Sequence, residues 1–200
     1  MKIGIIGAGK IGRAIARHMT RSGHDVIVSN SRGPESLESL VAELGQKAKA
    51  GTVAEAAAAP VVFLTVTWAQ LPAALAKLPA WKGRIAVDTT NAYVAQGSGM
   101  RLLDLGSKTS SEIVAEMVPG ARLVKAFNTL FHVLLAEEPR QAGGRRVIFL
   151  SGDDATAKAE VSQLIDQIGF AAVDLGGLVE GGKMQQAGAP LAGLNLVRLP

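Results

Sequence analysis

Residues 2–12 read KIGIIGAGKIG, and this stretch decides the fold. After Lys2 comes a short run rich in isoleucine, of the kind that forms a buried strand. Gly7, Gly9 and Gly12 follow at the spacing GxGxxG, directly after this strand and at the start of an amphipathic helix. Glycine-rich loops are common, but the strand–loop–helix context is typical of a dinucleotide-binding turn. We therefore expect an open α/β sheet with a nucleotide at its carboxyl edge.

Strands and helices alternate over the first ninety residues. Short β-branched runs predict the strands, and apolar residues at helical spacing, ended by glycine, predict the helices. The expected strands cover residues 2–6, 25–29, 61–67 and 84–88, and the expected helices cover residues 10–22, 34–44, 52–59 and 69–78. This alternation predicts a parallel sheet covered by helices on both faces, the doubly wound Rossmann arrangement of an α/β protein.

The pattern is less regular after residue 90, where three glycines predict a loop before the next helix. The expected elements are helices at 110–118 and 155–168, strands at 122–126, 145–150 and 170–174, and a turn of helix near 183–186. We place a domain boundary near residue 120. Residues 1–120 are then the nucleotide-binding Rossmann domain, and residues 121–200 a small C-terminal α/β lobe packed on it.

The three glycines of the loop have separate geometric roles. Gly7 permits the tight turn, Gly9 lets backbone N–H groups approach a pyrophosphate, and Gly12 lets the helix lie close to the strand. The helix N-terminus, at Lys10 and Ile11, offers free N–H groups and a partial positive charge to the phosphates. We expect all five residues to contact the cofactor.

The end of the second strand predicts which dinucleotide binds. NAD-binding domains usually place Asp or Glu about 20 residues after the glycines, to accept hydrogen bonds from the ribose. Here Asn30, Ser31 and Arg32 stand at that point, and no carboxylate occurs before Glu35. Serine can donate to a 2′-phosphate and a guanidinium can pair with it, so the sequence predicts NADP(H). The alternative is that Arg32 is an ordinary residue of the turn before Gly33.

Small side chains follow the next two predicted strands, where a doubly wound sheet holds its ligand. We expect the first group beside the adenosine or pyrophosphate and the second nearer the nicotinamide. Each residue alone is as well explained by a turn or a cap, but two successive strand ends favour a binding site. The residues are Thr65, Val66 and Thr67 in the first group, and Thr89, Thr90 and Asn91 in the second.

Composition argues against several other kinds of site. The chain has no cysteine, which excludes disulfides, thiolate nucleophiles and thiolate metal sites. Its three histidines are scattered without metal-ligand spacing, so we expect no metal. Lys and Arg number 21 against 17 Asp and Glu, a mild excess that is spread along the chain and predicts no nucleic-acid surface.

We also expect no membrane partner and a cytoplasmic location. The N-terminus lacks the long apolar region and cleavage site of a signal peptide. The longest apolar stretch, residues 56–66, contains Pro60 and is shorter than the about 20 residues that cross a bilayer.

Other titratable residues have simpler explanations than catalysis. We expect His18 and His24 to be structural, and Asp153 with Asp154 to begin a helix rather than to form a catalytic pair. Lys125 lies beside the predicted site, where a strand-end lysine is expected to be solvated. Contact with an anionic acceptor is the alternative for Lys125.

Five motifs together resemble the NADPH-dependent reductases of the deazaflavin coenzyme F-420. They are the glycine loop at 7–12, NSRGPESL at 30–37, VDTTN at 87–91, VKAFNTL at 124–130 and GGKMQQ at 181–186. The resemblance is closest to a bacterial branch of predicted dinucleotide-binding enzymes. It runs from residue 1 to about residue 196, nearly the whole chain.

The resemblance implies a Rossmann domain, a small C-terminal lobe that completes the acceptor site and carries dimer contacts, and a homodimer. It implies direct hydride transfer between NADPH and the deazaflavin ring, with Ser31 and Arg32 on the 2′-phosphate. The segment from Ala126 to Leu130 would face the second ring. Such a reaction needs no nucleophile, because stacking the rings at reacting distance supplies most of the catalysis.

One position departs from the family pattern. The archaeal enzymes that use coenzyme F-420 typically carry a histidine in this segment, and the matching residue here is Asn128. Asn128, Thr129 and His132 are therefore the candidates that face the acceptor, and no residue is assigned as catalytic. The acceptor is a small molecule: coenzyme F-420, another flavin, a quinone or an unidentified compound.

Two classes of function follow from these residues. The first is an NADP(H)-dependent oxidoreductase, favoured by a second lobe that can close a cleft and exclude water around the hydride. The alternative is a non-catalytic module that senses NADP(H) occupancy and controls an assembly.

Overall fold

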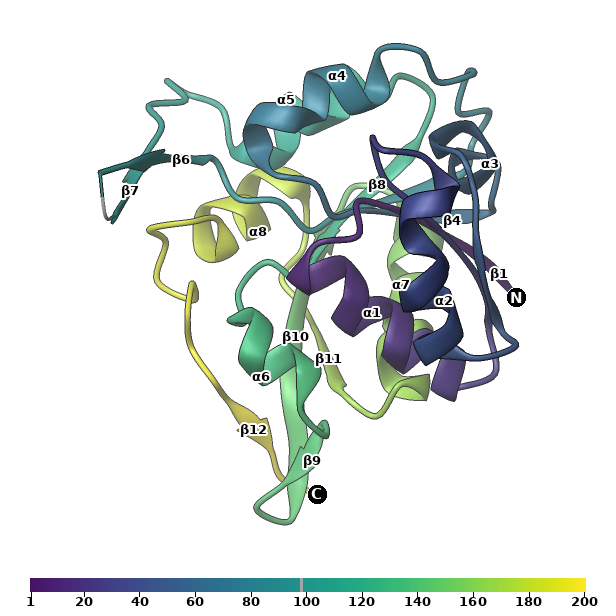
Figure 1. The fold of residues 1–200 in the computed structure, drawn as a ribbon. Coiled ribbons are helices and arrows are strands. Elements are labelled where there is room, and N and C mark those ends of the chain that lie inside the picture. Colours follow the sequence, from purple (N-terminus) through teal and green to yellow (C-terminus); the bar gives the residue numbers. More distant parts are fainter. Residues whose placement is uncertain (98) are drawn as a thin grey trace.

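Strands and helices alternate through the first ninety residues, as the hydrophobic pattern predicts (Figure 1). The computed structural model describes residues 1–97 and 99–200. The elements of this half, with η marking a 3₁₀ helix, are β1 (Lys2–Ile6), α1 (Lys10–Arg21), β2 (Asp25–Ser29), η1 (Pro34–Leu37), α2 (Glu38–Leu44), β3 (Ala48–Ala50), α3 (Val53–Ala57), β4 (Val61–Leu64), η2 (Trp68–Gln70), α4 (Leu71–Leu75) and β5 (Ile85–Asp88).

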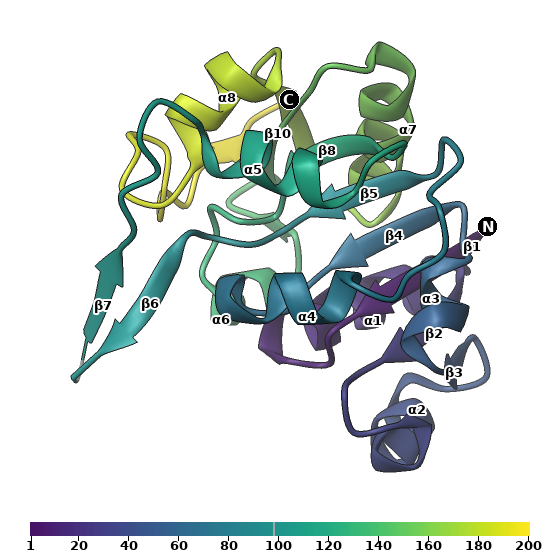
Figure 2. The same ribbon diagram turned by 90° about the horizontal axis from the view of Figure 1, so that it is seen from above.

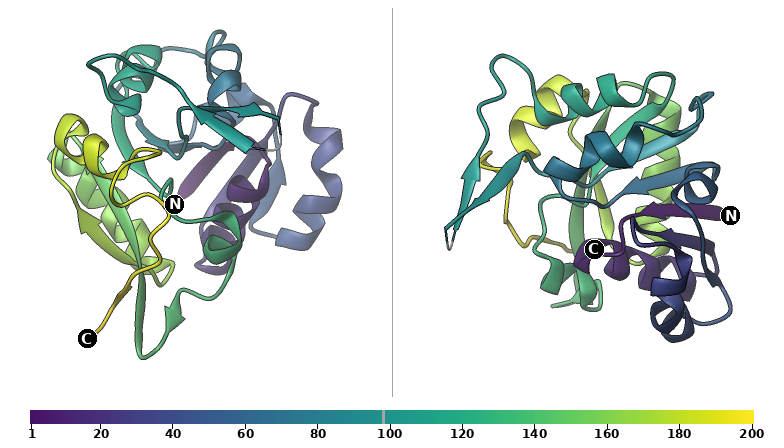
Figure 3. Two further views of the ribbon diagram at one scale, coloured as in Figure 1. Left: turned by 90° about the vertical axis from the view of Figure 1, so that its left-hand side faces the viewer. Right: turned by 45° about the horizontal axis from the view of Figure 1, so that its top comes forward.

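The second half of the chain adds more strands, and its C-terminal segment ends in β12, which pairs with β10. Its elements are β6 (Tyr93–Gln96), β7 (Gly99–Leu102), α5 (Ser110–Met117), β8 (Arg122–Ala126), α6 (His132–Ala136), β9 (Arg140–Gln141), β10 (Gly144–Gly152), α7 (Ala155–Gln167), β11 (Ala171–Asp174), α8 (Leu178–Gln185) and β12 (Val197–Arg198). Strands β6 and β7 pair only with each other and project from the body as a hairpin (Figures 2 and 3).

The described strands other than this hairpin form one sheet of ten strands. Its main path runs β11-β10-β8-β5-β4-β1-β2-β3, and β9 and β12 pair with β10. From β3 to β8 every neighbouring pair is parallel, while β10 runs antiparallel to β8. The order β3-β2-β1-β4-β5-β8 is that of a Rossmann fold, so the predicted fold class is confirmed.

Helices cover both faces of the sheet because successive side chains of a strand point to opposite faces. In β4, Val61 and Phe63 pack into one core with α1 and α7. Val62 and Leu64 of the same strand pack into a second core with α3, α4 and α5. Figure 2 shows α4 and α5 on the near side of the sheet and α1 on the far side.

The strands after residue 120 extend the sheet of the first half. β8 pairs with β5, and β10 and β11 follow outward from β8. Helix α8 then lies against β10 and β8, and it contacts α5. The C-terminal segment therefore adjoins the carboxyl ends of β5 and β8, where a doubly wound sheet holds its ligand.

Several elements differ from the sequence expectation, among them α6, β9 and β12, which no pattern predicted. β3 has three residues, AKA, which is too short to show a period. The hairpin occupies a segment expected to be loop, because its largely exposed residues give no buried face to detect. α8 begins at Leu178 and not near 183, since Gly181 and Gly182 weaken a helix in isolation but here pack against Ser151 and Thr109.

Residues 1–97 and 99–200 contain neither a membrane-spanning helix nor a cluster of metal ligands. No helix there combines the length and the apolar content that crossing a bilayer requires. No three His, Cys, Asp or Glu side chains in the same residues gather closely enough to hold one metal ion.

Candidate cofactor site

The turn between β1 and α1 requires glycine at two of its three glycine positions. Gly7 has φ +114°, and a Cβ there would lie 2.7 Å from the carbonyl group of Thr65. A Cβ on Gly12 would lie 2.0 Å from the carbonyl oxygen of Gly7. Gly9 differs, because a Cβ there would meet no atom within 4 Å. Gly7 and Gly12 therefore allow the turn to fold, and Gly9 leaves open space in front of it.

The N-terminus of α1 is free of side-chain caps. The N-cap residue is Gly9, which has no side chain to cap the helix, and the first turn carries no acidic residue. Such a helix end presents unpaired N–H groups and a partial positive charge, the combination that binds phosphate. Arg13 Nε donates to the carbonyl oxygen of Ala8 at 3.1 Å and steadies the loop. The pyrophosphate of a dinucleotide fits this turn.

The turn after β2 is shaped by Asn30. Its Oδ1 accepts a hydrogen bond from the backbone N–H of Arg32 at 2.8 Å, and its Nδ2 donates to Ser36 Oγ at 2.8 Å. Asn30 therefore holds the turn, while Ser31 and Arg32 stay exposed with their side chains available to a ligand. In the part of the chain that the structure describes, no carboxylate pairs with Arg32.

A cleft of about 750 Å³ joins these two turns. Eight of the predicted cofactor residues line it: Gly7, Gly9, Asn30, Ser31, Arg32, Thr65, Val66 and Thr67. Seven others do not line it: Lys10, Ile11 and Gly12 in the first turn of α1, Thr89, Thr90 and Asn91 after β5, and Ala126 at the end of β8. The cleft thus lies where the phosphate and adenosine end of a dinucleotide is expected.

The far wall of this cleft was not predicted from the sequence. That wall comes from α3, from η2 and from α4 with the residues after it. Its members are Val53, Ala54, Gln70, Ala73, Ala74, Lys77 and Leu78. The alanines and leucine suit a flat apolar ring such as adenine, and no motif in the sequence marks them.

Two of the predicted threonines have structural bonds of their own. Thr65 Oγ1 donates to the carbonyl oxygen of Gly7 at 2.6 Å, so it fixes the glycine turn from below. Thr67 forms a capping box with Gln70, in which Thr67 Oγ1 donates to Gln70 Oε1 at 2.9 Å. Both residues line the cleft and shape it at the same time.

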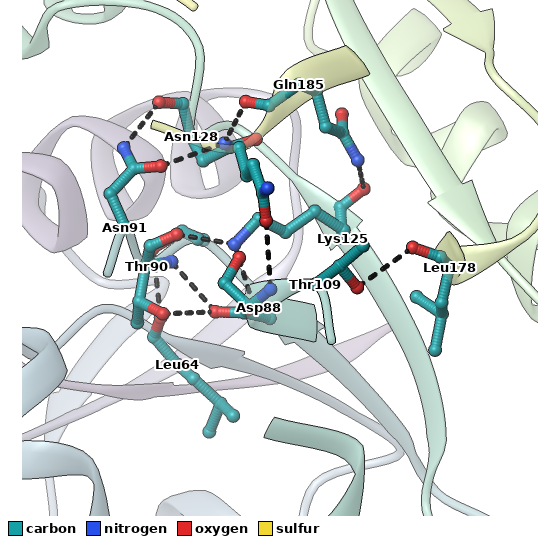
Figure 4. A network of polar contacts seen from close by, with 12 residues as sticks. Leu64, Asp88, Thr90, Asn91, Thr109, Lys125, Asn128, Leu178 and Gln185 are labelled. Carbon is teal, nitrogen blue, oxygen red and sulfur yellow. Dashed lines mark hydrogen bonds and ion pairs between the residues drawn. The ribbon is translucent and has the colours of Figure 1, made fainter. Parts of the chain in front are cut away.

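A buried polar network lies at the ends of β5 and β8 (Figure 4). Lys125 Nζ donates to Asp88 Oδ2 at 2.9 Å and also to the carbonyl oxygen of Thr90. Asp88 Oδ1 accepts from the Thr90 N–H at 2.8 Å and from Thr90 Oγ1 at 2.7 Å. The expectation of a solvated Lys125 is wrong, because its side chain is completely buried. The reason is register: Asp88 and Lys125 are directly opposite on parallel strands.

A pair of asparagines extends this network toward α8 (Figure 4). Asn91 Nδ2 donates to the carbonyl oxygen of Asn128 at 2.9 Å, and Asn128 Nδ2 donates back to Asn91 Oδ1 at 3.1 Å. Asn128 Nδ2 also donates to the backbone oxygen of Gln185 at 2.7 Å. Among the described atoms, Asn128 Oδ1 is a buried acceptor without a partner.

The other acceptor-facing candidates differ in exposure. Phe127, just before Asn128, has φ +65°, a rare conformation for a bulky residue, and its ring packs edge-to-face on Phe63. Thr129 is buried, and its carbonyl oxygen accepts from the N–H of Gly193 at 2.8 Å. His132 is partly exposed at the start of α6.

The remaining predictions concern residues outside the site. His18 Nε2 lies 2.7 Å from the carbonyl oxygen of Leu135, and burial lowers the pKa of His18. Burial also lowers the pKa of His24, and neither histidine lines the cleft. Asp154 Oδ1 accepts from the Ala157 N–H at 2.7 Å, which confirms it as the N-cap of α7.

Comparison with known proteins identifies relatives that share this architecture. Residues 2–92 match the family described as NADP oxidoreductase, coenzyme F420-dependent. A hypothetical protein from Sinorhizobium meliloti is 43% identical, with a TM-score of 0.93, 99% of this chain covered and 96% of that chain. A protein assigned as an F420-dependent NADP reductase from Arthrobacter sp. FB24 is 31% identical, with a TM-score of 0.78, covering 89% of this chain and 86% of that one.

A curated relative is larger than this chain. Metalloreductase STEAP3 of Rattus norvegicus is 30% identical over 178 residues, which are 88% of this chain and 34% of that protein. The chain thus spans about a third of the length of this curated relative. The match to the Arthrobacter protein extends over most of both chains. The family match of residues 2–92 carries a matching description, a coenzyme F420-dependent NADP oxidoreductase. The chain belongs to the family of coenzyme F420-dependent NADP oxidoreductases.

Proposed function

We propose that this chain is an NADP(H)-dependent oxidoreductase that transfers hydride between NADPH and a small acceptor, either a deazaflavin, a flavin or a compound of similar size. One observation carries the cofactor assignment. The turn after β2 presents Ser31 and Arg32 to the cleft, and the described residues that line the cleft include no carboxylate. A carboxylate there would repel a 2′-phosphate, whereas the guanidinium pairs with it.

The chain's own groups account for binding along the length of the cofactor. The N–H groups at the start of α1 would hold the pyrophosphate in the space that Gly9 leaves open. The apolar wall containing Ala73 and Leu78 would cover the adenine. Arg32 and Ser31 would hold the 2′-phosphate at the mouth of the cleft. Arg32, the charged group among these contacts, forms no ion pair with an acidic side chain of the described residues.

The nicotinamide end would lie by the asparagine pair, Asn91 and Asn128, since they follow β5 and β8, the two strands that continue the parallel sheet beyond β4. NADPH supplies the hydride when it is bound, and the protein's part is to orient it. In this proposal residues 121–200 act as the lobe that covers the acceptor and excludes water. The family resemblance also implies a homodimer, which light scattering on the purified protein tests.

The direct test is oxidation of NADPH with a panel of acceptors: a deazaflavin, FMN, FAD and a soluble quinone. Loss of the reduced-nicotinamide absorbance with at least one of them is expected. Arg32→Ala, tested at NADPH concentrations below saturation, should slow the reaction in proportion to its loss of affinity. No oxidation with the whole panel by a protein that binds NADPH contradicts the enzymatic part of this proposal.

A second candidate function has one observation in its favour. The described lining residues of the cleft include no histidine, aspartate or glutamate, the side chains that most often act as general acids and bases. A module that binds NADP(H) and signals its occupancy would look the same at this end. The two functions separate in the acceptor panel, because a sensor binds NADPH without consuming it.

A further inference from the structure

The charged side chains that line the described cleft are both cations. Arg32 follows β2, and Lys77 follows α4. The two residues therefore come from segments far apart in the sequence, the turn after β2 and the stretch after α4. Two cations facing one cleft repel each other, and an anion bound between them offsets this repulsion. The cleft therefore suits a ligand that carries negative charge at this end.

Lys77 is available to such a ligand. It is exposed, and none of the acidic groups in residues 1–97 and 99–200 forms an ion pair with it. Its flexible stem carries a point charge that can reach a phosphate from several directions. Most exposed lysines of this chain are not in the cleft, so its place among the lining residues is informative.

The surroundings of Lys77 indicate which part of a ligand it meets. Ala73, Ala74 and Leu78 are its neighbours along the chain and line the same wall. Val53 and Ala54 of α3 add to this apolar surface. An adenine ring on that wall would place its ribose, and any phosphate on the ribose, between Lys77 and the turn that carries Arg32.

We propose that Lys77 is a second determinant of specificity for the 2′-phosphate of the cofactor. Its ammonium group contacts the phosphate from the α4 side, while Arg32 contacts it from the β2 side. The ligand class is an adenine nucleotide phosphorylated at the 2′ position. This inference rests on the proposed function, because it assumes that NADP(H) occupies the cleft.

The test is calorimetric titration with adenosine 2′,5′-bisphosphate and with 5′-AMP, which differ only in the 2′-phosphate. Lys77→Gln should weaken binding of the bisphosphate about five-fold, the size expected of one exposed ion contact. Binding of 5′-AMP should change less than about two-fold, because the contact is absent there. Lys77→Arg keeps the charge and should bind the bisphosphate within about two-fold of the wild type.

Lys2→Gln is the matched control. Lys2 is also exposed, but it begins β1 and so lies at the end of that strand away from the cleft. Lys2→Gln therefore removes the same charge from the protein as Lys77→Gln does, without removing a contact to the phosphate. An equal loss in Lys2→Gln and Lys77→Gln would reduce the effect to net charge and overturn the proposal.

A double variant tests whether both cations meet one phosphate. If they do, the losses in Arg32→Gln and Lys77→Gln should not add in the double variant, because residues that share a partner are coupled. If bisphosphate binding is unchanged in Lys77→Gln but clearly weaker in Arg32→Gln, the role of Lys77 is overturned and the proposed cofactor preference stands. A wild-type protein that binds the bisphosphate no better than 5′-AMP overturns the proposed cofactor preference together with this inference.

Discussion

Lys125 Nζ lies 2.9 Å from Asp88 Oδ2, and neither side chain is exposed to solvent. The two residues are partners on the parallel strands β8 and β5, at the edge where both strands end. Because Lys125 also donates to the carbonyl oxygen of Thr90, the pair holds the turn that leads to Asn91. The geometry of the predicted nicotinamide end therefore depends on a buried ion pair that contacts no part of the cleft described above.

Lys125→Met should destabilise the protein severely. The substitution keeps the approximate length of the side chain but leaves Asp88 buried with its charge unpaired. Losing one partner of a buried pair costs about 3–5 kcal/mol. Urea unfolding followed by circular dichroism measures the difference in free energy of unfolding.

Asp25→Ala is the control for Lys125→Met. It breaks the exposed pair of Asp25 and Lys47, whose side chains are 62% and 52% exposed. Exposed pairs contribute about 0–1 kcal/mol, so this variant should unfold almost as the wild type does. Equal losses in the two variants would contradict the structural role of the buried pair.

Two glycine substitutions should separate folding from binding. Gly12→Ala places a Cβ 2.0 Å from the backbone oxygen of Gly7, so the turn must shift and the protein should lose about 2 kcal/mol or more of stability. Gly9→Ala places a Cβ in open space and should leave the free energy of unfolding nearly unchanged. That space is where the pyrophosphate approaches, so Gly9→Ala should weaken NADPH binding more than ten-fold, on the order of 1.4 kcal/mol. Wild-type affinity in Gly9→Ala would mean that the pyrophosphate lies elsewhere.

The stability of the protein should fall in mild acid partly through His18. Burial lowers the pKa of His18 below its usual 6.5, although the bond to the Leu135 carbonyl oxygen acts in the opposite direction. The folded state therefore binds the proton less readily than the unfolded state does. The contribution of His18 to the free energy of unfolding should be fully present above pH 6.5. This contribution should decrease as the pH falls below that value.

The variant that checks this pH dependence is His18→Gln. It removes the titrating group and should show a smaller decrease in stability below pH 6.5 than the wild type. His24 also has a pKa lowered by burial, but it is present in both proteins and cancels in the difference. Parallel stability curves for the two proteins in acid would show that His18 does not contribute.

The parts of the molecule that were predictable from sequence are those set by local geometry. The turn at residues 7–12 is one, because tight backbone contacts at Gly7 and Gly12 require glycine wherever such a turn occurs. The alternation of strands and helices through the first ninety residues is another, since each element carries its own hydrophobic pattern. The helix cap at Asp154 depends on neighbouring residues alone.

Features that depend on contacts between distant segments could not be predicted in this way. Lys125 has its partner 37 residues earlier, and only the register of β5 with β8 brings them together. Lys77 has no motif around it, and it enters the cleft through the packing of α4 on the sheet. The bond from Asn128 to Gln185 likewise requires α8 to return against β8.

The most direct measurement of the central claim is the affinity of the wild-type protein and of Arg32→Ala for NADPH and NADH, by calorimetry. Wild-type protein should prefer NADPH by about 10- to 100-fold, the effect of one charge-assisted contact. Arg32→Ala should lose most of that preference by binding NADPH more weakly, with NADH unchanged. Arg21→Ala, which removes an exposed arginine of α1 that does not line the cleft, should match the wild type. A wild-type protein that binds NADH more tightly, or equal losses for both nucleotides in Arg32→Ala, would contradict the account.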